Sequence, residues 1–244
     1  MKKRLDLLIL EKGLAGTRRR AQSLIMAGKV RVNDRPADKP GASVDAGASI
    51  VVKEKDFPYV GRGGVKLEKA LKHFKMDVSE AVCLDVGAST GGFTDCLLQN
   101  GASRVFAVDV GYGQLAWKLR QDPRVVVIER TNIRHMAPDA LPSPADLAVI
   151  DVSFISLKIV VPAALKFLKD EGRIIALIKP QFEAGRKNVG KGGVVRDPAV
   201  HDQVIQDLLD FFKEKNLSCL PVTDSPILGP KGNKEFLALM KKPG

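Results

Sequence analysis

From residue 82 onward, short apolar segments alternate along the chain with segments of helical periodicity. The apolar segments predict strands at Val82–Val86, Arg104–Val110, Arg124–Glu129, Asp146–Asp151 and Arg173–Lys179. Helices are predicted at Phe93–Asn100, 112–120, 155–169 and 198–215. Repeated strand–helix units of this length pack as a parallel sheet with helices on both faces. We therefore expect an α/β fold with a doubly wound sheet, which Leu217–Thr223 and Glu235–Lys241 complete as a hairpin.

The first 60 residues follow a different pattern and predict a separate, small α+β module. Apolar residues between Leu5 and Ile9 recur at helical spacing, and Thr17 is a good N-cap for a second helix that ends at Gly28. Short strands are predicted at 29–33, at Val44 and at 50–52. This quarter of the chain has 13 Lys+Arg and 7 Asp+Glu, so it carries +6 of the total net charge of +11. We expect domains at 1–58 and 59–244, joined by a linker at Lys53–Val60.

A net charge of +11 on 244 residues indicates an acidic partner, with nucleic acid the first candidate and an anionic membrane surface the second. The three cysteines and three histidines lack the spacing of a disulfide framework or a metal site, so we expect no metal. Asp6 and Glu11 interrupt the apolar N-terminal run, which argues against a signal peptide, and no stretch reaches 18 apolar residues. We expect a cytoplasmic protein that does not insert into membranes.

Ligands of doubly wound sheets bind beyond the carboxyl ends of the strands, so the residues after each strand are the candidates. The first predicted strand continues into Asp85-Val-Gly-Ala-Ser-Thr-Gly-Gly, a turn whose glycines let the backbone approach a ligand. Its spacing differs from the dinucleotide fingerprint Gly-x-Gly-x-x-Gly, and no Gly-Lys-[Ser/Thr] phosphate loop occurs. Asp109 lies 24 residues after Asp85, at the end of the second predicted strand, where it could bind a ribose hydroxyl. Asn132 follows the third predicted strand, where its amide could bind the edge of an adenine. These strand ends predict a binding site for a positively charged nucleoside such as S-adenosylmethionine. The alternative is that the glycine-rich turn has only a structural role.

Two further strand ends carry opposite charges. Asp151 ends the fourth predicted strand, and Lys179 ends the apolar fifth strand. Burial of a lysine is costly unless a partner neutralises it, and Asp151 can supply that partner. The two residues form either a structural ion pair or part of a catalytic site.

The N-terminal module contains, in order, a helix that follows Arg4, the cluster Arg18-Arg19-Arg20, the run Gly-Lys-Val-Arg-Val-Asn33, and Lys39-Pro40. This order resembles the S4 RNA-binding domain. The resemblance implies contacts to the phosphates of structured RNA from Arg4, Arg18, Arg19, Arg20 and Lys29. The alternative is a charged helix face that only contacts solvent.

The rest of the chain contains four motifs in order: Gly61-Arg-Gly-Gly-Val-Lys66, Asp146-Leu-Ala-Val-Ile-Asp151, Leu177-Ile-Lys179-Pro-Gln-Phe-Glu183 and Gly232-Asn-Lys-Glu235. They resemble the FtsJ-type RNA 2′-O-methyltransferases. With its S4 module the chain is similar to the TlyA family, also called hemolysin A, whose members are ribosomal RNA (cytidine-2′-O)-methyltransferases. The resemblance implies a Rossmann-like sheet that binds S-adenosylmethionine, ribosomal RNA within ribosomal subunits as partner, and a catalytic tetrad of Lys66, Asp151, Lys179 and Glu235. It implies cofactor contacts from Asp85, Gly87, Ser89, Gly91, Asp109 and Asn132.

Methyl transfer to a ribose 2′-oxygen requires that the oxygen lie close to the methyl donor and that a group take the hydroxyl proton. We assign Lys179 as the general base or hydroxyl-polarising group and Asp151 as the group that orients it. Lys66 and Glu235 are expected to position the substrate ribose.

Further contacts to RNA are expected around this site. The segment Gln181–Arg196 is rich in glycine and basic residues, which predicts either a mobile flap that contacts RNA or an ordinary solvated loop. The candidate RNA-binding residues of the larger domain are Arg62, Arg186, Lys187 and Lys191. Tyr112 and Trp117 either flank the adenine of the cofactor or belong to the core.

Three other functions compete with this interpretation. A non-catalytic RNA-binding or ribosome assembly factor would not need all four tetrad positions. A cytolysin, which the second family name suggests, needs an amphipathic or apolar segment that inserts into the membrane, and the sequence contains none. An NAD-dependent oxidoreductase is disfavoured by the glycine spacing. The sequence therefore favours a ribosomal RNA 2′-O-methyltransferase.

Overall fold

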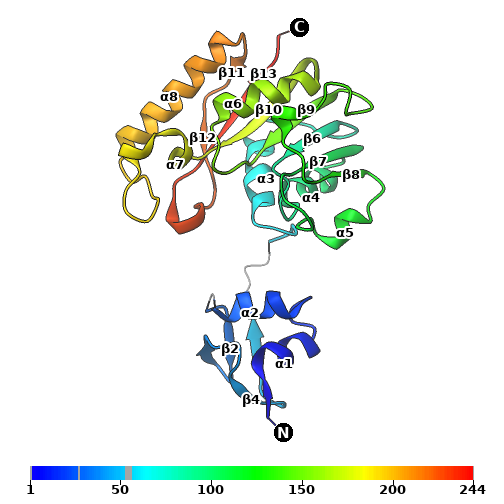
Figure 1. The fold of residues 1–244 in the computed structure, drawn as a ribbon, viewed down its shortest axis with the longest axis vertical. Coiled ribbons are helices and arrows are strands. Elements are labelled where there is room, and N and C mark those ends of the chain that lie inside the picture. The colour runs from blue at the N-terminus through cyan, green and yellow to red at the C-terminus, as the bar shows by residue number, and fades with distance from the viewer. Residues whose placement is uncertain (1, 27, 53–56, 244) are drawn as a thin grey trace. The chain divides into compact units, whose positions relative to one another are not determined.

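The computed structural model describes residues 2–26, 28–52 and 57–243. The chain divides into two compact units, Met1–Asp56 and Phe57–Gly244 (Figure 1). Half of the expected linker, residues 53–56, lies outside the described residues, whereas residues 57–60 belong to the larger unit.

The smaller unit is an α+β module, as its sequence predicts. Its elements are β1 (Lys2–Arg4), α1 (Leu5–Glu11), α2 (Arg18–Met26), β2 (Val30–Val32), β3 (Arg35–Ala37), β4 (Ser43–Asp45) and β5 (Ile50–Val52). Strand β2 pairs with β3 and β5, and β1 pairs with β4. The hydroxyl of Thr17 accepts a hydrogen bond from the backbone of Arg20 at 3.1 Å and so caps α2 as expected. Strand β3 was not predicted; Asn33 and Asp34 both have positive φ, which is the two-residue hairpin turn that joins it to β2.

The larger unit is built on one eight-stranded sheet, in which five consecutive strands are parallel. These are β6 (Val82–Val86), β7 (Arg104–Val108), β8 (Val125–Ile128), β9 (Ala145–Ile150) and β10 (Leu168–Ile178). Strand β13 (Phe236–Lys241) runs antiparallel beside β10, and the short strands β11 (Ser218–Cys219) and β12 (Thr223–Asp224) pair with it. The order is β11-β13-β10-β9-β6-β7-β8. This confirms the doubly wound sheet and its C-terminal antiparallel addition.

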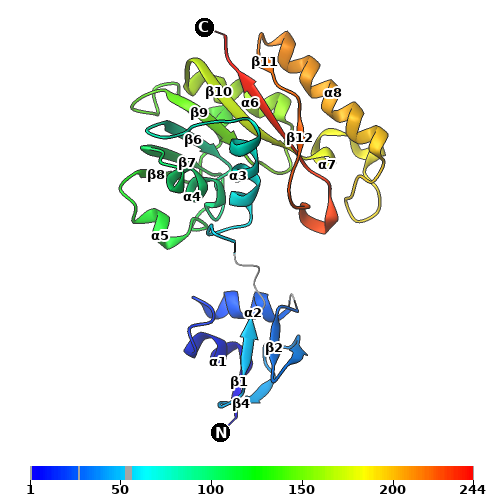
Figure 2. The ribbon, with the colours of Figure 1, turned by 180° about the vertical axis from the view of Figure 1, so that it is seen from behind.

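Helices cover both faces of the sheet (Figures 1 and 2). One apolar core includes residues of α6 (Leu157–Ala164) and α8 (Pro198–Glu214). The other includes residues of α3 (Gly63–His73), α4 (Gly92–Gln99) and α5 (Trp117–Arg120). Among the described residues, no helix has the length and apolarity needed to cross a bilayer.

Two predicted helices are shorter than expected. Only Trp117–Arg120 of the segment 112–120 is helical, since Gly113 adopts φ +70° and the chain turns there. The segment 155–169 forms α6 and a 3₁₀ turn at Leu165–Phe167, after which β10 already begins at Leu168. Helix α8 begins where it was predicted. Asp197 caps it by accepting a hydrogen bond from the backbone of Ala199 at 2.9 Å, and Pro198 occupies the first turn.

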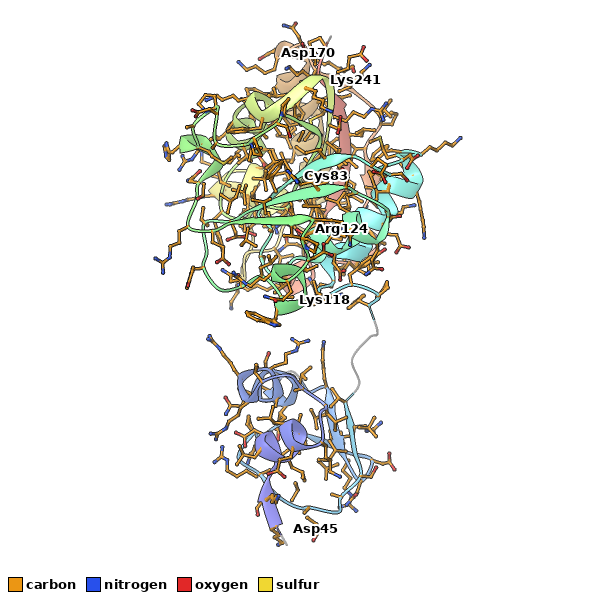
Figure 3. The ribbon with its side chains drawn as sticks, turned by 90° about the vertical axis from the view of Figure 1, so that its right-hand side faces the viewer. Asp45, Cys83, Lys118, Arg124, Asp170 and Lys241 are labelled. Carbon is orange, nitrogen blue, oxygen red and sulfur yellow. The ribbon has the colours of Figure 1, made fainter. Side chains whose placement is uncertain are left out.

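The strand order places a topological switch point between β6 and β9. The chain continues from β6 to β7 on one side, whereas β9 and β10 lie on the other. At such a point the connections diverge and leave a crevice at the carboxyl ends of the strands. Figure 3 shows the two ends of the larger unit, with Lys118 at one end, Asp170 and Lys241 at the other, and Cys83 of β6 between them.

Candidate active site

A cavity of about 250 Å³ lies at this switch point. Its walls come from the start of α3, the glycine turn after β6, the ends of β9 and β10, and the segment that precedes β13. The lining residues are Arg62, Gly63, Lys66, Gly87, Ala88, Ser89, Thr90, Gly92, Phe93, Asp151, Ser153, Lys179, Pro230 and Glu235. All four residues of the expected tetrad therefore line one cavity with part of the expected cofactor turn.

The tetrad is arranged as two ion pairs. The ammonium of Lys66 donates to Oε2 of Glu235 at 2.5 Å, and both side chains are buried. The ammonium of Lys179 lies 2.6 Å from Oδ1 of Asp151 and donates to Oγ of Ser153 at 3.1 Å. Oε1 of Glu235 accepts no hydrogen bond from any described residue. Buried ions of this kind are tolerated because each has a partner.

The glycine turn between β6 and α4 needs its glycines for steric reasons. Gly87 has φ +90°, and a Cβ there would lie 2.6 Å from the carbonyl oxygen of Asp151. Gly91 has φ +95° and precedes the first residue of α4. Other residues disfavour these conformations, so only glycine lets the turn pass this close to the end of β9. Gly87 and Ser89 line the cavity, whereas Gly91 does not.

Asp85 lies at the end of β6, beneath this turn, and is fully buried. Its Oδ2 accepts a hydrogen bond from the hydroxyl of Thr94 at 2.6 Å, and its Oδ1 has no partner among the described residues. Burial raises the pKa of Asp85 to about 7, although the Thr94 hydrogen bond opposes the shift. An unpaired carboxyl oxygen next to a glycine turn fits a cationic ligand, as the sulfonium and ammonium groups of S-adenosylmethionine would be.

Asp109 and Asn132, like Asp85, are expected cofactor residues that do not line the cavity. Asp109 accepts hydrogen bonds from the backbone of Ser89 at 2.7 Å and of Gly111 at 2.6 Å. It therefore fixes the glycine turn from the neighbouring strand end. Oδ1 of Asn132 accepts hydrogen bonds from the backbone and the guanidinium of Arg134 and so caps a 3₁₀ turn.

The first residues of the larger unit pack against α4. The backbone of Val60 donates to Oδ2 of Asp95 at 2.7 Å, and the side chain of Gln99 donates to the carbonyl of Pro58 at 3.0 Å. A Cβ at Gly92 would lie 2.9 Å from the backbone nitrogen of Gly64, so the two backbones are in close contact. This contact places Arg62 and Gly63 in the wall of the cavity.

The segment Gln181–Arg196 has more local structure than a simple loop. It contains most of α7 (Pro180–Glu183), a 3₁₀ turn at Arg186–Asn188 and a bridge between Gly190 and Val194. The buried side chain of Asn233 ties its end to the loop before β13. Its Oδ1 accepts from the backbone of Val195 at 3.1 Å, and its Nδ2 donates to the carbonyls of Gly193 and Pro230.

The expected RNA-binding residues of the larger unit, Arg62, Arg186, Lys187 and Lys191, are all exposed. The larger unit also has exposed aromatic residues. Tyr112 and Trp117 are 68% and 73% exposed, so the alternative that they belong to the core is wrong. The guanidinium of Arg130 lies 4.1 Å from the ring centroid of Tyr112. Near the tetrad, Phe154 is 90% exposed and adopts φ +65°.

In the smaller unit, all five expected RNA-binding residues are exposed, and two of them are held by one carboxylate. Arg4 and Arg18 both form ion pairs with the buried Asp6. Arg19, Arg20 and Lys29 lie at the start of α2 and just before β2.

Several residues of the site were not predicted. Ser153 lies two residues after the predicted strand end at Asp151, so the rule that ligands bind beyond strand ends could have identified it. Asp95 and Asn233 act through contacts to segments distant in sequence, and nothing in the local sequence indicates such contacts. Among the described residues, no group of three or more His, Cys, Asp or Glu could hold a metal ion.

Comparison with known proteins agrees with this geometry. Residues 59–242 match the model of the FtsJ-like methyltransferases, and residues 3–50 match that of the S4 domain. The chain is 46% identical over 239 residues to the 16S/23S rRNA (cytidine-2′-O)-methyltransferase TlyA of Mycobacterium tuberculosis, covering 98% of this chain and 89% of that protein. It is 42% identical over 239 residues to Hemolysin A of Brachyspira hyodysenteriae, covering 96% and 98%.

A solved structure from Streptococcus thermophilus, a candidate hemolysin by its name, is 46% identical and superposes with a TM-score of 0.79. The superposition covers 99% of this chain and 89% of that one. The two ion pairs, the glycine turn and the S4-like module thus occur in a chain that aligns with these relatives over nearly its whole length. The chain belongs to the FtsJ-like methyltransferases, in the group that carries an N-terminal S4 domain and includes TlyA and Hemolysin A.

Proposed function

We propose that this methyltransferase transfers a methyl group from S-adenosylmethionine to the 2′-hydroxyl of a cytidine in ribosomal RNA. The observation that carries the proposal is the cavity in which Lys179–Asp151 and Lys66–Glu235 face the glycine turn. The rRNA (cytidine-2′-O)-methyltransferase activity named for a relative at 46% identity supports the choice of substrate.

The residues of the glycine turn hold the cofactor in this proposal. Gly87 and Ser89 provide a close backbone surface, and Asp109 keeps that surface in shape through its two backbone hydrogen bonds. The carboxyl of Asp85 lies beside the turn, and a cation bound there would favour its ionised form. When bound, the cofactor supplies an activated methyl group attached to a sulfonium.

The tetrad acts on the hydroxyl that accepts the methyl group. Lys179 polarises the 2′-hydroxyl as an ammonium donor, or takes its proton after releasing one of its own to solvent, and its orientation is set by the two acceptors Asp151 and Ser153. The Lys66–Glu235 pair lines the same cavity and positions the substrate ribose. Fixing the ribose in this way brings the oxygen into line with the methyl donor.

RNA is bound by both units in this proposal. The exposed basic residues of the S4 module contact phosphates, and Arg62 with the 181–196 segment contacts the RNA near the cavity. The large positive charge of the chain favours such a polyanionic partner. We place the reaction on ribosomal subunits in the cytoplasm, where the target RNA is folded.

The test is methyl transfer from labelled S-adenosylmethionine to isolated ribosomal subunits, followed by mapping of 2′-O-methyl groups. Lys179→Ala should lower kcat by about a thousandfold because it removes the group that acts on the hydroxyl proton, while cofactor affinity stays near that of the wild type. Lys166→Ala, which changes an exposed lysine outside the cavity, is the matched control. No label in either subunit or in free RNA would contradict the proposed activity, and full turnover by Lys179→Ala would contradict the role of Lys179.

A further inference from the structure

Asp6 is an unusual residue for an RNA-binding surface. It is an acidic side chain in the first turn of α1, in the basic smaller unit, and it is fully buried. Burial of a carboxylate is unfavourable unless charged or hydrogen-bonding partners compensate for the lost water. The contacts of Asp6 therefore indicate what it does.

Three side chains donate hydrogen bonds to Asp6. Arg4 binds both oxygens, through Nε at 3.1 Å and Nη2 at 3.1 Å. Arg18 donates from Nε at 3.0 Å and Gln22 from Nε2 at 2.8 Å. The hydrogen bond from Arg4 is the main cause that holds the pKa of Asp6 well below its usual range, so the group stays ionised at neutral pH. One carboxylate thus connects the end of β1 with the first turns of α2.

Both arginines nevertheless reach the surface. Their side chains are each 49% exposed, while Asp6 is not exposed at all. A guanidinium has five N–H donors, of which Asp6 engages two in Arg4 and one in Arg18. Neither guanidinium donates a further hydrogen bond to a described residue, so the remaining donors are available to a ligand. Two arginines fixed by one buried carboxylate present a forked set of donors, which is the geometry that binds phosphate oxygens.

We propose that Asp6 is a positioning residue for RNA binding, which holds Arg4 and Arg18 in the conformation that engages the phosphates of structured RNA. This role rests on the proposed RNA-binding function of the smaller unit. A free arginine side chain loses rotamer entropy when it binds, and Asp6 removes most of that loss before RNA arrives. Asp6 would contact no RNA itself.

Charge alone predicts a different result. Asp6 is negative, so a purely coulombic view expects that its removal tightens RNA binding. The positioning role predicts the opposite for Asp6→Asn, because the amide cannot accept all the hydrogen bonds and presents donors to the arginines. The matched control is Asp38→Asn, which removes the same charge from an exposed side chain of the same unit.

The experiment uses the full chain with ribosomal subunits that carry the substrate RNA, and measures methyl transfer against RNA concentration at several salt concentrations. For Asp6→Asn we expect a KM for RNA about tenfold higher, an unchanged kcat at saturating RNA, and unchanged cofactor affinity. The slope of log affinity against log salt should also become shallower, by about one for each phosphate that the variant no longer binds. Asp38→Asn should bind RNA as tightly as the wild type or more tightly.

Equal or tighter RNA binding by folded Asp6→Asn would overturn the inference, while methyl transfer by the wild type would still support the proposed function. If thermal melting shows that Asp6→Asn unfolds the smaller unit, Gln22→Ala decides the question. This variant keeps both arginines and every charge but removes one hydrogen bond that fixes Asp6, so a KM for RNA several-fold higher supports positioning by Asp6, and a wild-type KM contradicts it. Absence of RNA binding by the wild type itself would instead remove the proposed function.

Discussion

At the scale of single residues, the most unusual group is Asp85. It is fully buried, one of its oxygens has no partner among the described residues, and burial raises its pKa to about 7. A buried carboxyl oxygen without a hydrogen-bond donor is unfavourable for the stability of the chain without its ligand. Such a cost at a strand end beside a glycine turn is typical of a group whose function lies in ligand binding.

Asp85 predicts a pH dependence of stability. An unfolded Asp ionises near 3.8, whereas in the folded chain Asp85 ionises near 7. Between these values the folded state holds a proton that the unfolded state has lost, so the stabilising contribution is complete below about pH 4 and is lost as pH rises towards 7. Asp85→Asn removes this dependence, because the amide does not titrate. The variant should therefore be more stable than the wild type by a margin that grows between pH 4 and pH 8, by up to about 4 kcal/mol of unfolding free energy. Urea unfolding of the ligand-free chain at both pH values measures the difference, and an equal gain at both values would show that burial does not perturb Asp85.

A second residue-scale prediction concerns Phe154. Its ring is 90% exposed, it adopts φ +65°, and it lies three residues after Asp151 with its ring 4.9 Å from that of Phe182. An exposed aromatic ring held in a strained backbone conformation beside the tetrad is suited to stack on a base. Phe154→Ala should therefore raise the KM for RNA about tenfold and leave cofactor affinity unchanged. Steady-state methyl transfer tests this, with Leu228→Ala as an exposed apolar control; equal KM values for both variants would contradict the stacking role.

At the scale of elements, the site depends on a cross-link between two loops. Asn233 joins residues 193–195, at the end of the 181–196 segment, to the loop that carries Pro230 and Glu235. The side chain is buried and all of its hydrogen bonds are made inside the chain. Both loops are therefore expected to move as one unit, so that the position of Glu235 depends on a residue outside the tetrad.

Asn233→Ala should lower both stability and catalysis. Loss of the amide leaves the Val195 N–H and the Gly193 carbonyl without their partner, which costs about 2–3 kcal/mol of unfolding free energy. The kcat should fall more than tenfold because Glu235 is no longer held against Lys66. Asn188→Ala, an exposed asparagine of the same segment, is the control for thermal melting and for kcat. A kcat for Asn233→Ala equal to that of this control would contradict the coupling between the two loops.

At the scale of the whole molecule, the smaller unit, which is proposed to bind RNA, carries more than half of the net positive charge. The first 60 residues carry a net +6, and the remaining residues carry +5. The cofactor cavity, in contrast, contains paired charges of both signs. RNA binding and cofactor binding should therefore respond differently to ionic strength.

Between 50 and 200 mM salt, RNA affinity should fall about a hundredfold or more, because each phosphate contact releases condensed counterions. Cofactor affinity should change by less than about twofold over the same range, since the charges around the cavity are paired and mostly buried, where salt screens weakly. Filter binding of RNA and calorimetry of S-adenosylmethionine measure the two quantities on the same full chain. An RNA affinity that is as insensitive to salt as cofactor affinity would contradict phosphate binding by the basic residues.

The sequence by itself determined the order and type of most elements, and it predicted a two-part organisation and a tetrad of four residues that the structure brings to one cavity. Several signals depend only on residues close together in the sequence and can therefore be recognised without the structure. They are apolar periodicity, the N-caps at Thr17 and Asp197, and charged residues at strand ends. The tertiary structure alone showed that Lys66 pairs with Glu235, since the two residues are 169 positions apart in the sequence. It also decided that Asp109 supports the glycine turn through backbone hydrogen bonds and that Asp6 holds two arginines. Contacts between segments distant in sequence depend on how the whole chain packs, and no local pattern encodes them.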